Sequence, residues 1–439
     1  MSKIFSDFFK GNLFKGDKGV WMIYFFLCMI SLVEIYSASS TLTYETGNHL
    51  APVINQAGFL LVGFLVILLV HRIPCKWFML FPFALLPLAV VFLIYATFFA
   101  PEVNDTGRWI AIGPIRFQPS ELGKAALIMS VAVVLAKTQV EKTVVVRGKQ
   151  KTVASAIKGG RTLAFKIVMG LTILICGLIF PENFSTAAML ALVIVVMMFI
   201  GHVPLDLMGK SALVVIALGM VAVMMMITLD TGTLQSIPGC KRLATVKARF
   251  ERRMEAQKEE SDSIDFAKYI NDENSQVTHA FIAVANSNVI GLGPGNSIER
   301  DFLSHAESDF IYSIIIEEMG FAGGVFVLFL YFALLIRVGR IAQKCRRFFP
   351  AYLVLGFGIM MVLQAFVNMG VAVGLFPVTG QPLPLISRGG TSILITSFYI
   401  GVILSVSRYA EKISEENVLA TEAKATEDAT EYYDDKNID

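Results

Sequence analysis

The side chains best suited to chemistry in this 439-residue chain are charged residues that lie beside or inside long apolar segments. They gather in three clusters, at residues 107–124, 305–320 and 368–392. An ionisable group at membrane depth is costly, so such a residue is by default a candidate for function. We expect all three clusters to face the same side of a membrane.

The first cluster, GRWIAIGPIRFQPSELGK, runs from a loop into a predicted helix. Glu121 and Lys124 are three residues apart and share one helical face, while Arg108 is predicted outside the membrane. Ser120 is predicted to cap the helix. Arginine and lysine are natural phosphate ligands, which favours a cationic site for an anionic headgroup. The alternative is a buried ion pair between Glu121 and Lys124 that fixes helix packing.

The second cluster, HAESDFIYSIIIEEMG, leads into another predicted helix. Asp309 is predicted in the first turn of that helix, where a carboxylate could serve as a base or could simply balance the helix dipole. Glu317 and Glu318 follow about two turns deeper, inside an apolar run. At least one of them needs a cation, and Lys124 is the predicted partner.

The third cluster, at 368–392, contains three prolines and five glycines within otherwise helical sequence. This composition is typical of a loop packed against protein rather than lipid. Ser387, Arg388, Gly389 and Gly390 then open a helix, and such an N-terminus with an arginine favours anion binding. A tight re-entrant turn that requires glycine is the alternative.

The composition of the chain predicts helices that cross a membrane and position these clusters. Hydrophobic residues make up 55% of the chain and charged residues 16%, against roughly a quarter charged in soluble domains. Runs of about 20 apolar residues match the thickness of a bilayer core. The net charge of +2 and the dispersed basic residues do not favour a nucleic-acid partner. We therefore predict an all-α polytopic membrane protein with ten transmembrane helices, at 20–40, 53–70, 77–99, 119–136, 165–180, 185–201, 211–229, 310–336, 350–376 and 391–407.

The distribution of lysine and arginine orients these spans. Short loops on one side are rich in basic residues, and those on the other side hold only Arg108, Arg116 and Arg388. The rule that basic loops stay inside predicts that both termini are cytoplasmic. A large outer loop is then expected at about 230–309, between the seventh and eighth spans.

The parts outside the membrane domain are predicted from their composition. From Glu411 onward the chain has ten acidic residues against three lysines, which indicates a disordered tail. The five cysteines have no metal or redox spacing and only Cys240 is predicted outside, so we expect no intrachain disulfide. The predicted organisation is an amphipathic cytoplasmic N-terminus at 1–19, a membrane domain at 20–408 and an acidic cytoplasmic tail at 409–439.

The motifs in the three clusters closely resemble those of the SEDS family (shape, elongation, division, sporulation). They are GRWI-x-IGP-x-x-FQPSE, SDFI-x-x-x-x-x-EE-x-G and the block from Asn368 that contains GQPLPLISRGGTS. The resemblance runs from Val20 to Arg408. VTGQPLPLISRGGTS and the chain length are more similar to the division branch, FtsW, than to the elongation branch, RodA. One departure lies two residues before Asp309, where many members have histidine and this chain has Glu307.

The resemblance implies a peptidoglycan glycosyltransferase that polymerises lipid II and works with a class B penicillin-binding protein. For a division member it also implies the septum of the bacterial cytoplasmic (inner) membrane, an FtsI-like transpeptidase and the FtsQ, FtsL and FtsB proteins. Asp309 corresponds to the proposed catalytic residue, and a divalent cation, Mg or Mn, could assist. The expected substrate-binding residues are Arg108, Gln118, Ser120, Glu121, Lys124, Ser387, Arg388, Gly389 and Gly390.

Two other functions compete with the polymerase. A lipid II flippase would need a polar path through the bilayer, often built from inverted repeats, and the chain shows no convincing internal repeat. A scaffold that recruits a transpeptidase would tolerate the loss of Asp309. An elongation polymerase of the RodA type is the nearest alternative within the family.

Overall fold

A computed structural model shows nine long helices in the part of the chain that it describes. The described residues are 14–38, 50–99, 110–112, 115–146, 149–156, 159–181, 183–213, 275–303 and 306–435, with a few isolated positions between 224 and 247. The long helices are α2 (Lys18–Ala38), α4 (Ala51–Val70), α5 (Phe81–Phe99), α6 (Pro119–Lys137), α7 (Gly160–Ile179), α8 (Phe184–Ile200), α14 (Ile311–Lys344), α15 (Phe348–Ala372) and α16 (Gly390–Asp435).

These helices agree with nine of the ten predicted spans. Eight of the described helices are long and apolar enough to cross a membrane, and α8 is apolar but has only 17 residues. The remaining predicted span, 211–229, lies almost entirely outside the described residues, as do Cys240 and most of the outer loop. The chain is therefore a multi-pass helical membrane protein.

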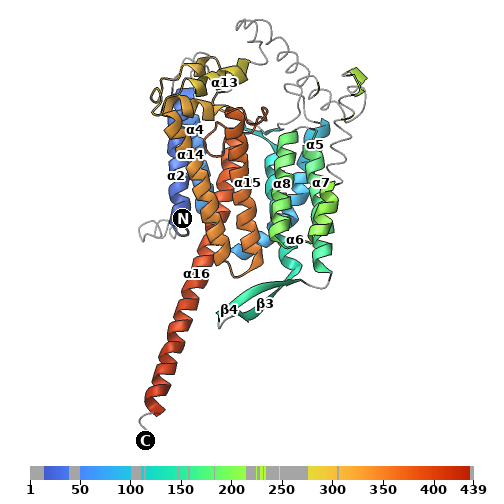
Figure 1. Cartoon of the computed structure of the whole chain (residues 1–439), viewed down its shortest axis with the longest axis vertical. Helices are drawn as coiled ribbons and strands as arrows, with labels where there is room; N and C mark the ends of the chain where they lie inside the picture. Colours follow the sequence, from blue (N-terminus) through green and yellow to red (C-terminus); the bar gives the residue numbers. More distant parts are fainter. Residues whose placement is uncertain are drawn as a thin grey trace.

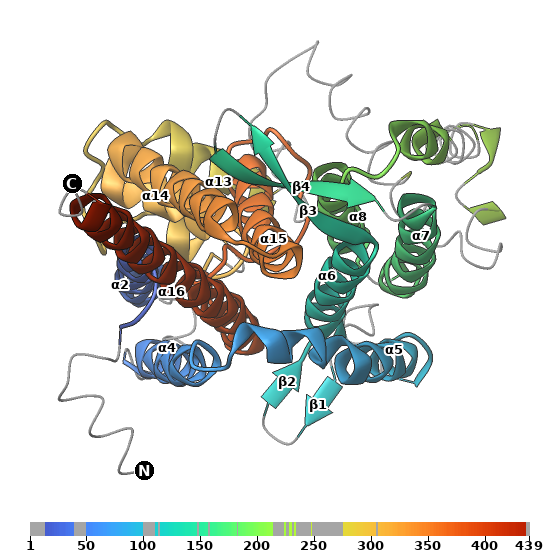
Figure 2. The ribbon, with the colours of Figure 1, turned by 90° about the horizontal axis from the view of Figure 1, so that it is seen from below.

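Helices α6 and α15 lie inside the bundle, and this position decides where the polar clusters meet. Viewed along the helices, α5 and α7 are peripheral, and α6 lies between them and α15 (Figure 2). Most of α6 is buried. A Cβ atom on Gly356 of α15 would collide with Ile128 of α6 and Met197 of α8, so glycine is needed for this close approach.

Short strands occur where an all-α fold was predicted. β1 (Ile110–Ile112) pairs with β2 (Ile115–Phe117), and β3 (Gln139–Val146) pairs with β4 (Lys149–Ala156), both antiparallel. The β3–β4 hairpin lies between the predicted spans 119–136 and 165–180, in one of the short loops that are rich in basic residues. Its Val- and Thr-rich sequence has high β propensity, which explains the second hairpin.

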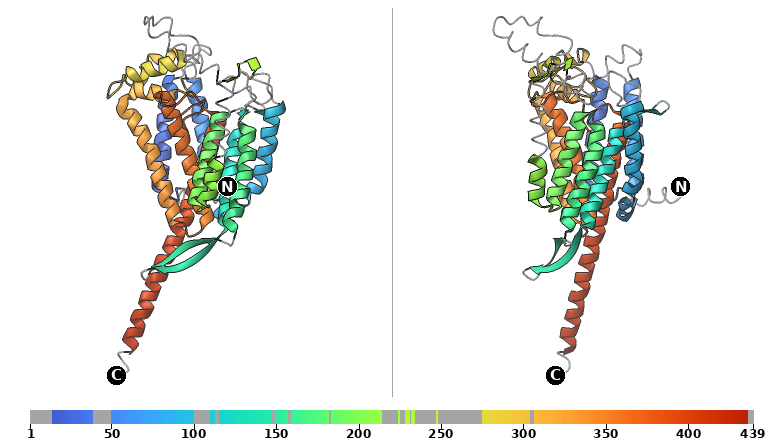
Figure 3. Two further views of the ribbon diagram at one scale, coloured as in Figure 1. Left: turned by 45° about the vertical axis from the view of Figure 1, so that its right-hand side comes forward. Right: turned by 90° about the vertical axis from the view of Figure 1, so that its right-hand side faces the viewer.

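The acidic tail is helical rather than disordered. α16 continues without interruption to Asp435 and extends beyond the bundle, past the β3–β4 hairpin (Figures 1 and 3). The segment is rich in glutamate and alanine, which are strong helix formers. The prediction from low hydrophobicity underestimated this local propensity.

Four cysteines lie in the described residues, and all four are free thiols. Cys75 lies in η1 (Cys75–Met79), and Cys345 is the C-cap residue that follows α14. Burial raises the pKa of each of these two thiols to about 12. Both are therefore protonated at neutral pH, which makes them poor nucleophiles and poor metal ligands.

Three further short helices complete the path between the elements above. η1 joins α4 to α5. Helix α13 (Ser275–Ala285) and η2 (Glu299–Asp301) precede α14. Helix α13 packs against the N-terminal end of α14, which follows Asp309, and lies above the bundle in Figure 1. We call this end of the bundle the site end.

Candidate functional site

Asp309 lies in a turn just before α14. Phe310 is the N-cap residue and the helix begins at Ile311, so Asp309 precedes the first turn instead of lying in it. The helix begins two residues after Asp309, so the prediction that Asp309 lies in its first turn was wrong. The residue is partly buried, and its backbone carbonyl accepts a hydrogen bond from Asn368 Nδ2 at 2.9 Å. The positive end of the α14 dipole still faces this turn.

Three hydrogen bonds join the turn at Asp309 to the turn that opens α16. Arg388 donates its backbone N–H to the Glu307 carbonyl at 2.8 Å, and its Nη1 lies 3.4 Å from Glu307 Oε1. Ser387 Oγ donates to the Ser308 carbonyl at 2.5 Å. The second and third clusters therefore meet in space, although about 80 residues separate them in the chain.

The arginine in this turn keeps solvent contact. Its side chain is 38% exposed, whereas that of Glu307 is 10% exposed. One guanidinium edge is held by Glu307, and the side chain remains accessible to an anionic ligand. The Glu307 that distinguishes this chain from many SEDS members is thus the partner of Arg388.

Glycine at the start of α16 has a packing role. A Cβ atom on Gly390 would lie 2.8 Å from the Phe59 ring of α4. Gly390 therefore allows close packing against α4, whereas the anion site and the tight re-entrant turn both stay predictions. The adjacent Gly389 has no comparable obstruction, since its nearest neighbour is Ser392 at 3.3 Å.

The buried pair in α6 is present as predicted. Lys124 Nζ lies 2.7 Å from Glu121 Oε1 and has no exposed side-chain surface. Its ammonium also donates to Gln364 Oε1 at 3.0 Å, and Gln364 Nε2 donates to the Pro382 carbonyl at 2.9 Å. The first cluster is therefore connected to the third through an amide of α15.

The start of α6 differs from the prediction. The N-cap residue is Gln118, with no side-chain capping bond, and Pro119 occupies the first helical position. Ser120 is therefore inside the helix and cannot be its cap. Its hydroxyl is buried and has no hydrogen-bond partner in the described part of the chain. A proline at the first helical position explains the shift, because its fixed φ suits that position.

Buried amides that we did not predict link the site to its surroundings. Asn368 Nδ2 donates both to the Asp309 carbonyl and to the Gln381 carbonyl, at 2.9 and 2.8 Å. Gln381 Nε2 in turn donates to Thr186 Oγ1 at 2.8 Å and approaches Asn183 Oδ1 at 3.3 Å. For Asn368 the available signal was an amide inside an apolar helix, because a buried amide needs partners.

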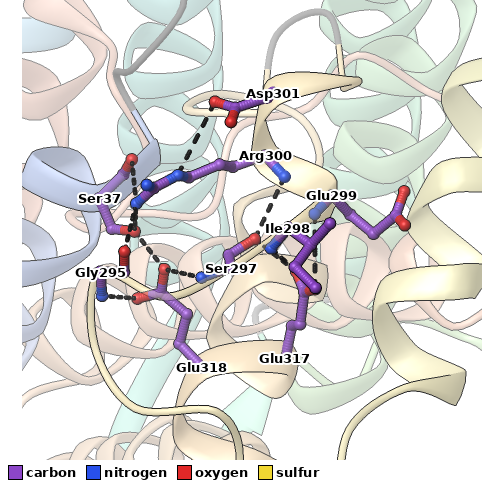
Figure 4. Close-up of polar contacts among 9 residues, drawn as sticks. All are labelled: Ser37, Gly295, Ser297, Ile298, Glu299, Arg300, Asp301, Glu317 and Glu318. Carbon is purple, nitrogen blue, oxygen red and sulfur yellow. Dashed lines mark hydrogen bonds and ion pairs between the residues drawn. The ribbon is translucent and has the colours of Figure 1, made fainter.

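Glu317 and Glu318 do not pair with Lys124. Glu318 accepts hydrogen bonds from the backbone N–H groups of Gly295 and Ser297, at 3.0 and 3.2 Å, and from Ser37 Oγ (Figure 4). Glu317 accepts from the Ile298 N–H at 3.1 Å and from Ser297 Oγ. Backbone amides thus replace the expected cation. Lys124 is already paired with Glu121, which explains the error.

These two carboxylates form a clamp on the segment that follows α13, and we call them the glutamate clamp. Gly320 has φ +71°, and a Cβ atom on it would collide with the Val289 carbonyl. Arg300 adds a second connection, since its Nη1 donates to the Gly295 carbonyl at 2.7 Å and to Ser37 Oγ at 3.0 Å. The clamp therefore fixes residues 295–300 against α2 and α14 at the site end.

The predicted cations are only partly described. Arg108 lies outside the described residues, and Arg116 is described in β2 by its backbone alone. No group of three metal-binding side chains occurs among the described residues. Asp309 could supply one carboxylate ligand to a divalent ion, whereas Glu307 is paired with Arg388. Magnesium commonly uses one or two carboxylates together with substrate phosphates, so this donor set stays compatible with the prediction.

The geometry defines a class of protein: a multi-pass membrane protein with a polar site at one end, assembled where α6, α14, α15 and α16 converge. The whole membrane domain matches one family model, that of the cell cycle proteins FtsW, RodA and SpoVE, over residues 18–412. The chain belongs to this FtsW/RodA/SpoVE family, as the three motifs predicted.

Several relatives are similar over most of their length. A probable peptidoglycan glycosyltransferase FtsW of Nitrosococcus halophilus is 32% identical, over 80% of this chain and 81% of the relative. The protein of the same name from Nitrosomonas europaea is 29% identical, over 86% of this chain and 89% of the relative.

Solved structures share the fold. RodA of Thermus thermophilus superposes with a TM-score of 0.57 at 22% identity, covering 90% of this chain and 97% of that one. A chain from a peptidoglycan synthase complex, studied for its coordination of polymerization and crosslinking, gives 0.65 at 22% identity and covers 90% and 98%.

Proposed function

We propose that this protein is a peptidoglycan glycosyltransferase that polymerises lipid II, with the site end at the outer face of the membrane. The observation that carries the proposal is the turn at Asp309, which the bonds of Glu307 and Ser308 to Arg388 and Ser387 join to the start of α16 at the site end. Relatives named peptidoglycan glycosyltransferase FtsW support the reaction and favour a role in division. The strong basic bias of the opposite loops supports the orientation.

Asp309 acts in this proposal as the general base. Glycan polymerisation requires removal of a proton from a sugar hydroxyl of the acceptor while that oxygen attacks the anomeric carbon of the donor. A carboxylate within hydrogen-bond reach can accept this proton. Attack opposite the leaving group inverts the anomeric configuration. The hydrogen bonds from Asn368 and Ser387 hold the backbone of this turn in place.

The leaving group is a lipid-linked diphosphate, so the site must stabilise developing negative charge. Arg388 is the described cation that can reach it, because part of its guanidinium is exposed. Arg108 is the second proposed ligand. Lys124 acts indirectly, since it is fully buried and holds Gln364 and through it the loop at Pro382. A magnesium or manganese ion at Asp309 would add positive charge at the diphosphate.

The partner of the proposed polymerase is a class B penicillin-binding protein. The peptidoglycan synthase complex that contains a chain with the same fold supports this assignment, because that complex coordinates polymerization and crosslinking. For a division enzyme the partner is an FtsI-like transpeptidase, and the assembly includes FtsQ, FtsL and FtsB. The proposed location is the septum of the cytoplasmic membrane.

The test is polymerisation of labelled lipid II by the purified full chain together with its cognate transpeptidase. We expect Asp309→Asn to lose at least about 100-fold in rate, the usual contribution of a general base. Asp301→Asn is the matched control, because Asp301 is a solvent-exposed acid at the same end of the bundle, 3.8 Å from Arg300.

Both variants must retain wild-type thermal stability and partner binding. Equal polymerisation by wild type and Asp309→Asn would show that Asp309 serves only the turn and the helix dipole. If the wild type is inactive under conditions that support a known polymerase, the flippase and scaffold functions become the better explanations.

A further inference from the structure

The surface of α14 carries an apolar groove far from the site. The groove has a volume of about 540 Å³ and is lined between Val325 and Ile336 by leucine, phenylalanine and alanine side chains. Phe329 and Phe332 are exposed there. Arg337 and Arg340 close the groove at the end opposite to the site.

A second, polar pocket begins at the same two arginines. It has a volume of about 120 Å³ and is also lined by Lys344, Asp17 and Glu411. Because Arg337 and Arg340 line both spaces, the groove and the pocket form one continuous surface, apolar along the helix and polar at its end.

The length of the groove matches one leaflet of a bilayer. Val325 and Arg337 are twelve positions apart, which corresponds to about 18 Å of helix. Half of a bilayer core is about 15 Å. Arg337 lies beside Asp17, which immediately precedes the first residue of α2, so it lies at the level of the membrane surface. The groove therefore runs from that surface to about the bilayer midplane.

The polar pocket has more positive than negative charge. Both carboxylate oxygens of Asp17 already have partners within the chain. Its Oδ1 accepts a hydrogen bond from the Val20 N–H at 3.0 Å, and its Oδ2 lies 3.5 Å from Arg337 Nη1. Among the described residues, none forms an ion pair with the side chain of Arg340 or Lys344. Glu411 also lines the pocket and offsets one of these charges, so three cations face two carboxylates and the pocket keeps one net positive charge for an anion from outside the chain.

We propose that this surface binds an anionic phospholipid. Its acyl chain lies along α14 from Ile336 toward Val325, and its phosphate lies between Arg340 and Lys344. Basic pockets beside membrane helices are known to select anionic headgroups. A transmembrane helix of a partner protein would fill the groove but would leave the polar pocket without an anion, so charge complementarity favours the lipid. The proposal needs only the membrane fold and is independent of the glycosyltransferase assignment.

The test is lipid retention by the purified full chain, measured by native mass spectrometry. The protein is equilibrated with equimolar phosphatidylglycerol and phosphatidylcholine that carry identical acyl chains. We expect preferential retention of phosphatidylglycerol by the wild type. In Arg340→Gln/Lys344→Gln the preference should fall by about fivefold for each basic residue removed.

Arg346→Gln/Arg347→Gln is the matched control, since it removes two exposed charges from the neighbouring loop outside the pocket. It should retain the wild-type preference. Ala333→Trp provides a second test, because it fills the groove and leaves every charge in place; we expect it to reduce phosphatidylglycerol retention.

Three results would overturn the proposal. Equal retention of both lipids by the wild type would show that no selective site exists. If the pocket variant and the control variant lose the preference for phosphatidylglycerol equally, the general surface charge of the protein causes the preference. If Ala333→Trp leaves lipid retention unchanged but prevents co-purification of the cognate transpeptidase, the groove is a protein interface.

Discussion

At the scale of single residues, Lys124 shows how a buried charge can serve a site that it does not touch. Its charge is balanced by Glu121 and its remaining hydrogen-bonding capacity is used by Gln364. Two such charges gain little stability over an apolar pair, but each depends strongly on the other. The pair is therefore best tested by removing its members separately and together.

We predict that Lys124→Met destabilises the protein by about 3–5 kcal/mol, because it leaves the carboxylate of Glu121 buried without its cation. The double variant Glu121→Gln/Lys124→Met should be closer to wild type in stability. Thermal unfolding in detergent measures both effects. If the single and double variants unfold together, the ion pair is not coupled as the structure indicates.

The two variants also separate stability from activity. In the double variant Gln364 loses the ammonium that holds it, so we expect reduced polymerisation even where the thermal midpoint is restored. Wild-type activity at restored stability would limit the pair to a packing role.

At the scale of elements, the glutamate clamp joins α14 to the segment that follows α13. Carboxylate oxygens accept stronger hydrogen bonds than neutral amide oxygens do. The segment at 295–300 has little regular structure beyond η2, so these bonds largely determine its position. We expect local opening of this segment to depend on the charge of the clamp.

We predict that Glu318→Gln increases hydrogen exchange at the Gly295 and Ser297 amides by about fivefold to tenfold. The reason is that hydrogen bonds to a charged acceptor contribute about 1 kcal/mol more than neutral ones. Exchange at α6 amides should not change. Asp206→Asn is the control, because Asp206 is an exposed acid that lies outside the clamp and outside the segment at 295–300, and similar exchange in all three proteins would show that the clamp does not hold the segment.

At the scale of the whole molecule, the orientation in the membrane decides whether the site can reach an extracytoplasmic substrate. The β3–β4 hairpin and the site end lie at opposite ends of the bundle (Figure 1). The basic residues around the hairpin predict that it is cytoplasmic.

We predict that an impermeant maleimide labels Asn286→Cys in intact spheroplasts and labels Lys149→Cys only after permeabilisation. Both variants are made in a Cys240→Ser background, since that thiol is predicted on the outer side. Asn286 is exposed and lies just after α13. The reverse labelling pattern would place the site end in the cytoplasm and would exclude the proposed polymerase.

The local sequence was sufficient to predict most of the membrane helices and to identify the family. Apolar runs of about 20 residues specify a membrane helix, since a bilayer leaves the backbone few alternatives. Nine of the ten spans were identified in this way, and the three motifs identified the family. The pair of Glu121 and Lys124 was also predictable, because both lie on one face of one helix.

Tertiary structure alone decided which distant groups meet. Only the folded bundle brings Arg388 to Glu307, Asn368 to the Asp309 carbonyl and the glutamate clamp to residues 295–299. Helical periodicity determines which face of a helix a residue occupies, but the partner of that face depends on how other helices pack against it. A buried carboxylate requires a donor, and either a cation or a set of backbone amides can meet that requirement; the packing of this chain selected the amides.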